Sequence, residues 1–216
     1  MHLLIFDLDG TLVDSKQDLI DSVNATRGFM NMAPLPGELV AKYVGRGALA
    51  LIQSALGDSA TREQVERAHT FFIEYYGTHM LDKTVLYDGV REALDRLRTK
   101  GHTLAVLTNK PVRFSERMMA QLGLAQHFVR IYGGNSFEPK KKPDPIGILT
   151  LLDETGISKA NTIMVGDSAV DIRTARNAGV QACGCLWGFQ PETFVAEPPD
   201  FQIEHLGQLV DRLTGE

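Results

Sequence analysis

The chain of 216 residues has no excess of basic residues and no long apolar run. Its formal net charge is −5 and its isoelectric point is about 5.7, so it lacks the basic surface that nucleic acids and anionic membranes attract. No segment approaches the ~20 apolar residues that span a bilayer, and the apolar start of the chain meets a charge at Asp7. These absences argue against nucleic acid and membrane partners. They predict a cytoplasmic protein that binds a small ligand.

The chain is also poor in cysteine. Cys183 and Cys185 are its two cysteines, and they lie two positions apart in an apolar run. That spacing puts both on one face of a strand, which is unfavourable for a disulfide between them. The six histidines are scattered without the spacing of metal ligands. We therefore expect two buried free thiols and no cysteine or histidine metal site.

What the chain has in quantity is short apolar runs, which are typical of parallel strands covered on both faces. Four clear runs and one weaker run are found at residues 3–6, 104–107, 163–165, 180–186 and, the weaker one, 129–132. Segments with helical periodicity and recognisable ends lie between them, at residues 90–100, 144–156 and 168–178. Strand and helix alternate, so the sequence predicts an α/β fold, a Rossmann-like open parallel sheet with helices on both faces.

The stretch from residue 16 to residue 83 breaks this alternation, because it has helical patterns and no convincing strand. We interpret residues 16–83 as an inserted helical cap domain, and residues 1–15 and 84–216 as the α/β core domain. Within the insertion, Thr61 and Gln64 form a capping-box pattern that opens a helix. The apolar side of that helix is predicted to carry Val65, Ala68, Phe72 and Tyr75.

Polar side chains follow three of the predicted strands. Asp7 and Asp9 follow the first strand, Thr108 the second, and Asp167 the run at 163–165. Ligands of open α/β sheets gather at the carboxyl ends of the strands, so these groups should meet at one edge. Clustered carboxylates need a cation, and an all-oxygen site suits Mg²⁺. The sequence therefore predicts a magnesium site at this edge.

Four short motifs carry a resemblance to a known family. They are "DLDGTLVDS" at residues 7–15, "LTNK" at 107–110, "KKPDP" at 141–145 and "GDSAVDI" at 166–172. In this order and spacing they resemble the four motifs of the haloacid dehalogenase-like hydrolase superfamily. Within that superfamily the chain most resembles phosphoglycolate phosphatases, and the insertion after the first motif resembles their helical cap.

The resemblance implies a role for each matching residue. Asp7 would be the nucleophile that forms an aspartyl-phosphate, and Asp9 the general acid and base. Mg²⁺ would be held by the Asp7 side chain, the Asp9 backbone carbonyl and Asp167, with Asp171 as a neighbour that orients these ligands. The phosphate oxygens would be held by Thr108, the Asn109 backbone N–H and Lys142.

Three further residues have competing interpretations. Asp144 is interpreted as a helix N-cap rather than a ligand, and Lys110 is left outside the site. Arg46, between Gly45 and Gly47, is either an exposed arginine in a flexible turn or a residue that points at the active site. In the second case its guanidinium would bind the carboxylate of a small acid such as 2-phosphoglycolate.

The expected activity is therefore Mg²⁺-dependent hydrolysis of a small phosphorylated metabolite, with 2-phosphoglycolate as the preferred candidate. The alternatives are a pyrophosphatase or another phosphomonoesterase of the same family. Sugar phosphomutases fit the resemblance less well, because their last motif usually has no acidic residue at the Asp171 position. A non-catalytic binding module on this fold fits less well, because the nucleophile, acid/base, phosphate and metal positions that the resemblance implies are all present.

Overall fold

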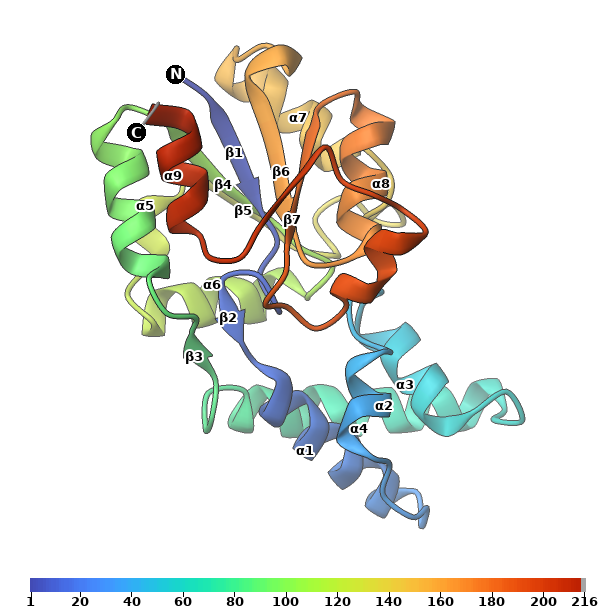
Figure 1. The fold of residues 1–216 in the computed structure, drawn as a ribbon. Helices are drawn as coiled ribbons and strands as arrows, with labels where there is room; N and C mark the ends of the chain where they lie inside the picture. The colour runs from blue at the N-terminus through green and yellow to red at the C-terminus, as the bar shows by residue number, and fades with distance from the viewer. Residues whose placement is uncertain (215–216) are drawn as a thin grey trace.

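A computed structural model describes residues 1–214, and its centre is a six-stranded parallel sheet in the order β5-β4-β1-β6-β7-β8 (Figure 1). The strands are β1 (Leu3–Phe6), β4 (Thr103–Leu107), β5 (Arg130–Tyr132), β6 (Thr162–Gly166), β7 (Gln181–Cys185) and β8 (Phe201–Ile203). The predicted α/β class with an open parallel sheet is confirmed. All five expected strands are present, and β8 adds an edge that the sequence analysis did not predict.

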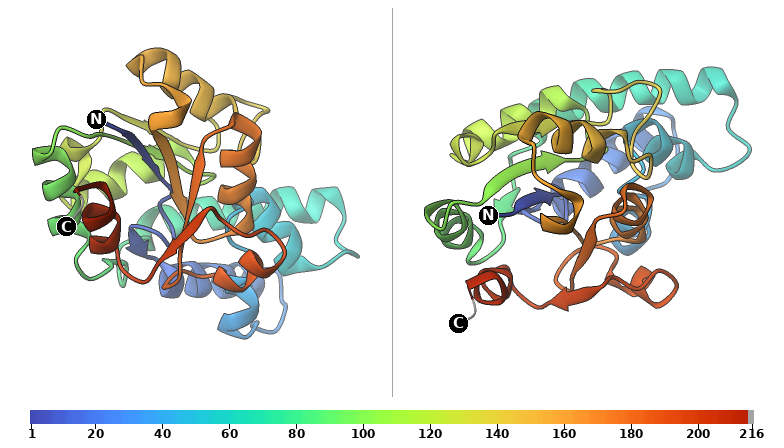
Figure 2. Two further views of the ribbon diagram at one scale, coloured as in Figure 1. Left: turned by 45° about the horizontal axis from the view of Figure 1, so that its top comes forward. Right: turned by 90° about the horizontal axis from the view of Figure 1, so that it is seen from above.

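Helices cover both faces of this sheet (Figure 2). They are α5 (Val90–Thr99), α6 (Val112–Gln121), α7 (Ile146–Thr155), α8 (Ala169–Ala178) and α9 (Gly207–Thr214), with short 3-10 turns η1 (Ala125–His127), η2 (Lys159–Asn161) and η3 (Pro191–Val195). Side chains of successive strand residues point to opposite faces. Leu4 and Phe6 of β1 therefore pack in the cluster that includes α5, α6 and α9, whereas Leu3 and Ile5 pack with α7 and α8.

Residues 16–83, which we call the helical segment, contain four helices and, among these described residues, no strand. These helices are α1 (Lys16–Phe29), α2 (Gly37–Ala41), α3 (Ala48–Leu56) and α4 (Arg62–His79). The segment lies beyond the carboxyl ends of the central strands (Figure 1). Helical content agrees with the sequence analysis, while the division into core and cap domains at residues 15 and 84 stays a prediction.

The buried side of α4 differs by one residue from the prediction. Val65, Ala68 and Phe72 are buried as expected, but the fourth buried residue is Tyr76, and Tyr75 is only partly buried. The spacing of four residues from Phe72 to Tyr76 keeps the two rings on one side of the helix, where they stack with centroids 5.5 Å apart. The predicted Thr61–Gln64 capping box is present.

A short antiparallel pair joins the helical segment to the sheet. Strand β2 (Val13–Asp14) pairs with β3 (Val85–Leu86), so the two connecting chains run side by side. Next to this pair, the buried Asp18 carboxylate accepts hydrogen bonds from the backbone N–H groups of Lys83 and Thr84 and from the Thr84 hydroxyl. The entrance and exit of the segment are thus fixed to each other.

Helix α7 begins one residue later than predicted. It starts at Ile146, with Pro145 as its N-cap residue, so Asp144 precedes the cap position. Its carboxylate nevertheless accepts a hydrogen bond from the Ile146 N–H at 2.9 Å, which satisfies one of the free donors of the first turn.

The two cysteines form no disulfide with each other. Cys183 and Cys185 are free and fully buried, as expected. Burial raises the pKa of both thiols, which makes them poor nucleophiles. Within residues 1–214, no helix combines the length and apolar character needed to cross a membrane.

Candidate active site

The predicted site residues meet at the carboxyl edge of the sheet. From the central strand β1 the chain order places β4 on one side and β6 on the other, which makes this edge a topological switch point. Asp7, Thr108 and Asp167 each directly follow one of these three strands. All three line one cavity of about 50 Å³ that lies between the sheet and the helical segment.

Asp7 is buried at the end of β1, and its Oδ1 lies 2.9 Å from Lys142 Nζ. Burial raises the pKa of the Asp7 carboxyl to about 6; the Lys142 ammonium opposes this rise and the nearby Asp171 carboxylate adds to it. A carboxylate with so much unfavourable negative charge around it is suited to meet a cation.

Lys142 also contacts a second carboxylate. Its Nζ lies 2.6 Å from Asp171 Oδ1, while Asp171 Oδ2 accepts hydrogen bonds from the Ser168 backbone N–H and hydroxyl at the start of α8. Both oxygens of Asp171 therefore have partners in the protein. This arrangement fits its predicted place behind the ligands, where it holds Lys142 in position.

Asp167 completes a buried group of three carboxylates. One oxygen each of Asp7, Asp167 and Asp171 lie within 4.8 Å of one another. Burial raises the pKa of Asp167 well above its ordinary value, and the Asp171 and Asp7 carboxylates raise it further. The Phe189 N–H donates to Asp167 Oδ2 at 2.6 Å and opposes this rise. Oxygen donors with one nearby lysine and excess negative charge form a set that fits Mg²⁺.

The structure explains why Gly10 of the first motif is a glycine. Gly10 has φ of +79°, a conformation that other residues rarely adopt. A Cβ atom at this position would also lie 2.2 Å from Asp167 Oδ2. Glycine therefore lets the turn that carries Asp9 approach Asp167 closely.

Asp9 lies in the same cavity and has two polar partners. The Ser15 hydroxyl donates to Asp9 Oδ1 at 2.6 Å, and Lys110 Nζ lies 2.8 Å and 3.0 Å from the two carboxylate oxygens. The sequence analysis left Lys110 outside the site, whereas in the structure its side chain is only 4% exposed, contacts Asp9 and lines the same cavity. Its position two residues after Thr108 was the available signal.

Lys110 also reaches the helical segment. Its Nζ donates a hydrogen bond to the Tyr76 hydroxyl of α4 at 2.5 Å, and it lies 4.6 Å from the centre of the Tyr76 ring. The sequence analysis placed Phe72 and Tyr75 on the apolar side of this helix and gave that side no part in the site. Tyr76 and Phe72 are indeed buried, but both also line the cavity that holds Asp7 and Asp9.

The remaining predicted phosphate-binding residues lie at the end of β4. Thr108 and Asn109 are buried and line the cavity. The Asn109 side-chain amide donates to the backbone carbonyls of Lys142 and Gly45, each at 2.9 Å. Asn109 thus connects the loop that carries Lys142 to the loop of the helical segment that carries Gly45.

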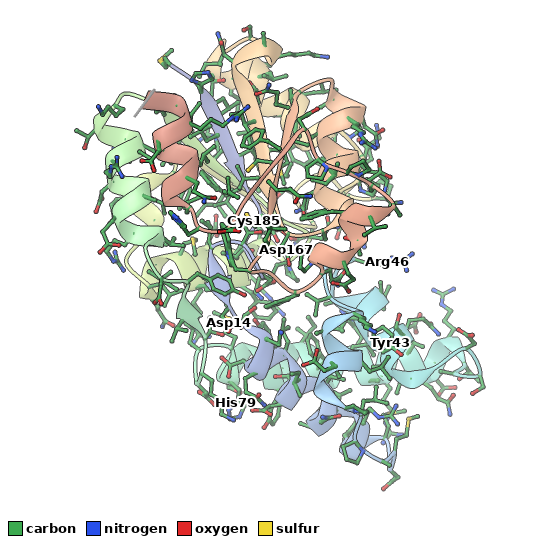
Figure 3. The ribbon with its side chains drawn as sticks, viewed as in Figure 1. Asp14, Tyr43, Arg46, His79, Asp167 and Cys185 are labelled. Carbon is green, nitrogen blue, oxygen red and sulfur yellow. The ribbon has the colours of Figure 1, made fainter. Side chains whose placement is uncertain are left out.

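The structure does not place Arg46 in the cavity of Asp7. Its side chain is exposed, and Figure 3 shows it at the periphery of the molecule, away from Asp167. Gly45 and Gly47 line the cavity of Asp7, whereas Arg46 lines a second cavity of about 610 Å³ together with Lys141 and other residues. The loop turns the arginine outward, which agrees with the interpretation of Arg46 as an exposed arginine in a turn.

The fold and this site define a class of protein. Residues 4–185 match the family model described as haloacid dehalogenase-like hydrolase, and the chain belongs to that family. Among curated proteins, it is 40% identical over 221 residues to a phosphoglycolate phosphatase of Vibrio vulnificus, covering 98% of this chain and 95% of the relative. A phosphoglycolate phosphatase of Chromobacterium violaceum is 37% identical over 210 residues, with 95% and 93% covered.

Solved structures give the same picture. A predicted phosphoglycolate phosphatase from Haemophilus somnus superposes with a TM-score of 0.90 at 31% identity, over 99% of this chain and 97% of that one. A protein from Lactobacillus delbrueckii superposes with a TM-score of 0.92 over the full length of both chains, and its 24% identity supports the fold alone.

Proposed function

We propose that this protein is a Mg²⁺-dependent phosphatase that hydrolyses a small phosphorylated acid, with 2-phosphoglycolate as the preferred substrate. The observation that carries the proposal is the buried Asp7 carboxylate, 2.9 Å from Lys142 Nζ, in the same cavity as Asp9. The cavity of about 50 Å³ has room for only a few water-sized groups, which favours a small substrate. The names of the curated relatives support phosphoglycolate.

The chemistry follows from two carboxylates with different positions. Asp7 attacks the phosphorus atom, and the bond between phosphorus and the leaving alkoxide breaks as the aspartyl-phosphate forms. Asp9 donates a proton to the leaving alkoxide and then accepts one from the water that attacks the aspartyl-phosphate. Phosphate leaves and the Asp7 carboxylate is regenerated. The two roles need two residues, because a carboxylate bonded to phosphorus cannot also transfer the proton.

The donor set supports a magnesium site. We propose that Asp7, Asp167 and the Asp9 backbone carbonyl hold the ion, because both oxygens of Asp171 already have protein partners. When bound, Mg²⁺ offsets negative charge on the phosphoryl group and on the carboxylates. Thr108, the Asn109 N–H and Lys142 hold the phosphoryl oxygens and stabilise the charge that develops on them.

The helical segment is proposed to act as a cap that moves. It meets the core in the Asn109–Gly45 and Lys110–Tyr76 contacts, directly over the cavity. Opening near residues 15 and 84 would admit the substrate, and closing would exclude water from the aspartyl-phosphate.

A phosphate-release assay tests the proposal. Purified protein is supplied with 2-phosphoglycolate, other phosphorylated metabolites, pyrophosphate and an aryl phosphate, with Mg²⁺ or with EDTA. We expect Mg²⁺-dependent release, fastest from 2-phosphoglycolate, and none from Asp7→Asn because an amide is a poor nucleophile. Asp58→Asn, at an exposed aspartate remote from the site, is the matched control. Release by Asp7→Asn at the wild-type rate, or none from any ester by the wild type, would contradict the proposed function.

A further inference from the structure

The candidate cavity has one wall that the proposed chemistry does not use. Beyond Asp9 it is lined by apolar side chains of the helical segment and by two polar groups, the Lys110 ammonium and the Tyr76 hydroxyl. Among the described residues that line this cavity, Lys110 is the only one with a cationic side chain. Lys142 lies behind Asp7, 1% exposed, and holds Asp7 and Asp171.

The position of Lys110 matches where the rest of a substrate must lie. Asp9 is proposed to protonate the leaving oxygen, so the organic part of the substrate starts beside Asp9 and continues away from Asp7. In a phosphorylated 2-hydroxy acid such as 2-phosphoglycolate, the carboxylate carbon is only two covalent bonds from the leaving oxygen. Lys110 Nζ, within 3.0 Å of both Asp9 oxygens, lies at this short reach.

The chemistry of the wall suits a carboxylate. The three ammonium protons of Lys110 meet the two Asp9 oxygens and the Tyr76 hydroxyl, so a substrate carboxylate would replace one Asp9 oxygen as a partner of Lys110. The Tyr76 hydroxyl, which accepts from Lys110, still has a proton of its own to donate. Burial raises the pKa of Tyr76 to about 12, so the hydroxyl keeps that proton at neutral pH. A carboxylate enclosed among Phe72, Phe114 and Leu51 would be strongly destabilised without such partners.

We infer that Lys110 and Tyr76 form the subsite that binds the carboxylate of the substrate, in place of the role first considered for Arg46. The inference rests on the proposed phosphatase activity and deepens it, because it makes the protein selective for phosphorylated 2-hydroxy acids over neutral phosphate esters. Lys110 comes from the core and Tyr76 from the helical segment, so the subsite is complete only when the two parts meet.

The test compares two substrates that differ only in the acid group. The ratio of kcat/KM for 2-phosphoglycolate to kcat/KM for ethyl phosphate is measured with Mg²⁺ in wild type, Lys110→Met, Tyr76→Phe and Arg46→Ala. Lys141→Met, at an exposed lysine next to the second cavity, is the matched control. Melting temperatures establish that each variant is folded.

We expect the ratio to fall by at least about 10-fold in Lys110→Met and by a smaller factor in Tyr76→Phe, because a charged hydrogen bond is lost only with the acid. Lys141→Met and Arg46→Ala should keep the wild-type ratio. If Lys110→Met does not fold, Tyr76→Phe, which removes one oxygen atom, carries the same test.

Three results would overturn the inference: equal loss on both substrates in Lys110→Met and Tyr76→Phe, a lowered ratio in Arg46→Ala alone, or a wild type that does not prefer the acid. Equal loss would mean that Lys110 only orients Asp9. Failure of the proposed function is distinguishable, because the wild type would then hydrolyse neither ester.

Discussion

Two lysines neutralise carboxylates in the candidate site, but their partners come from different parts of the chain. Lys142 contacts Asp7 and Asp171, which all belong to the part of the chain around the sheet. Lys110 contacts Asp9 on the same side but also Tyr76 of the helical segment. The first pairing therefore needs only residues around the sheet, whereas the second also needs the helical segment. Under the proposed function, this difference would separate phosphate chemistry from recognition of the substrate.

The largest effect is expected from removal of Lys142. Lys142→Met leaves the buried Asp7 and Asp171 carboxylates without their cation, so the metal-free protein should lose about 3–5 kcal/mol of unfolding free energy. Its kcat/KM should fall by about 10³-fold, and to the same extent for acidic and neutral esters. Urea denaturation in EDTA and the two-ester assay check both values. A loss confined to the acidic ester would remove the distinction between the two lysines.

A cross-link between the two parts should come next. Thr78 of α4 and Arg117 of α6 are exposed, and the neighbouring Gly77 carbonyl accepts a hydrogen bond from Arg117 at 2.6 Å. With Thr78→Cys and Arg117→Cys joined by a short cleavable thiol reagent, turnover should fall in proportion to the cross-linked fraction and return on cleavage.

Each single-cysteine variant with the same reagent is the control for that experiment. The native thiols at positions 183 and 185 are fully buried and should not react. Unchanged turnover of the fully cross-linked protein would contradict opening of the helical segment.

The negative charge of the buried carboxylates Asp7, Asp167 and Asp171 should make the unfolding free energy depend on pH. The pKa of the Asp7 carboxyl is raised from its ordinary value of 3.8 to about 6 in the folded protein. The neutral carboxyl therefore contributes its full share of the unfolding free energy below pH 3.8, and this contribution is lost as pH rises through 6. In EDTA, the stability of Asp7→Asn relative to wild type should therefore rise by about 2 kcal/mol between pH 4 and pH 8. Urea denaturation at both pH values measures this gain. A difference between the two proteins that is the same at both pH values would contradict it.

The smallest effect is expected at the contacts between Gln190 and the helical segment. Gln190 donates from its amide to the carbonyls of Ala41 and Val44, each at 2.9 Å. Gln190→Ala should raise KM by up to about 30-fold and leave the acid-to-neutral ratio unchanged, because each of the two lost hydrogen bonds is worth about 1 kcal/mol. Gln126→Ala, which removes an exposed amide bonded to Gly123, is the control, and an equal rise there would argue against the role of Gln190.

The strands and most helices around the sheet were predictable, because their apolar runs are buried on both faces and their ends carry glycine or capping residues. Strands β2 and β3 have two residues each, too few for any periodicity, and they exist through pairing with each other. Helices α6 and α9 and strand β8 were likewise not assigned from sequence. Their positions depend on packing against elements that are distant in the chain.

Among the site residues, those that directly follow strands were placed correctly at one edge. Asp7, Thr108 and Asp167 needed only the parallel sheet. Tyr76 was missed because a helix turns 100° per residue, and a choice between Tyr75 and Tyr76 requires the phase of α4 against its neighbours. The sequence left the direction of Arg46 open, because flanking glycines permit a close approach without fixing the direction of the side chain.

The pairing of β2 with β3 has a consequence for the history of the chain. Val13 lies opposite Leu86 and Asp14 opposite Val85, so the points where the chain leaves and re-enters the sheet domain are neighbours. A gene segment that encodes the residues between them could be exchanged for another of different length or shape without moving the ends that the sheet must join. The strands and their carboxylates would keep their places whichever segment joined these two ends.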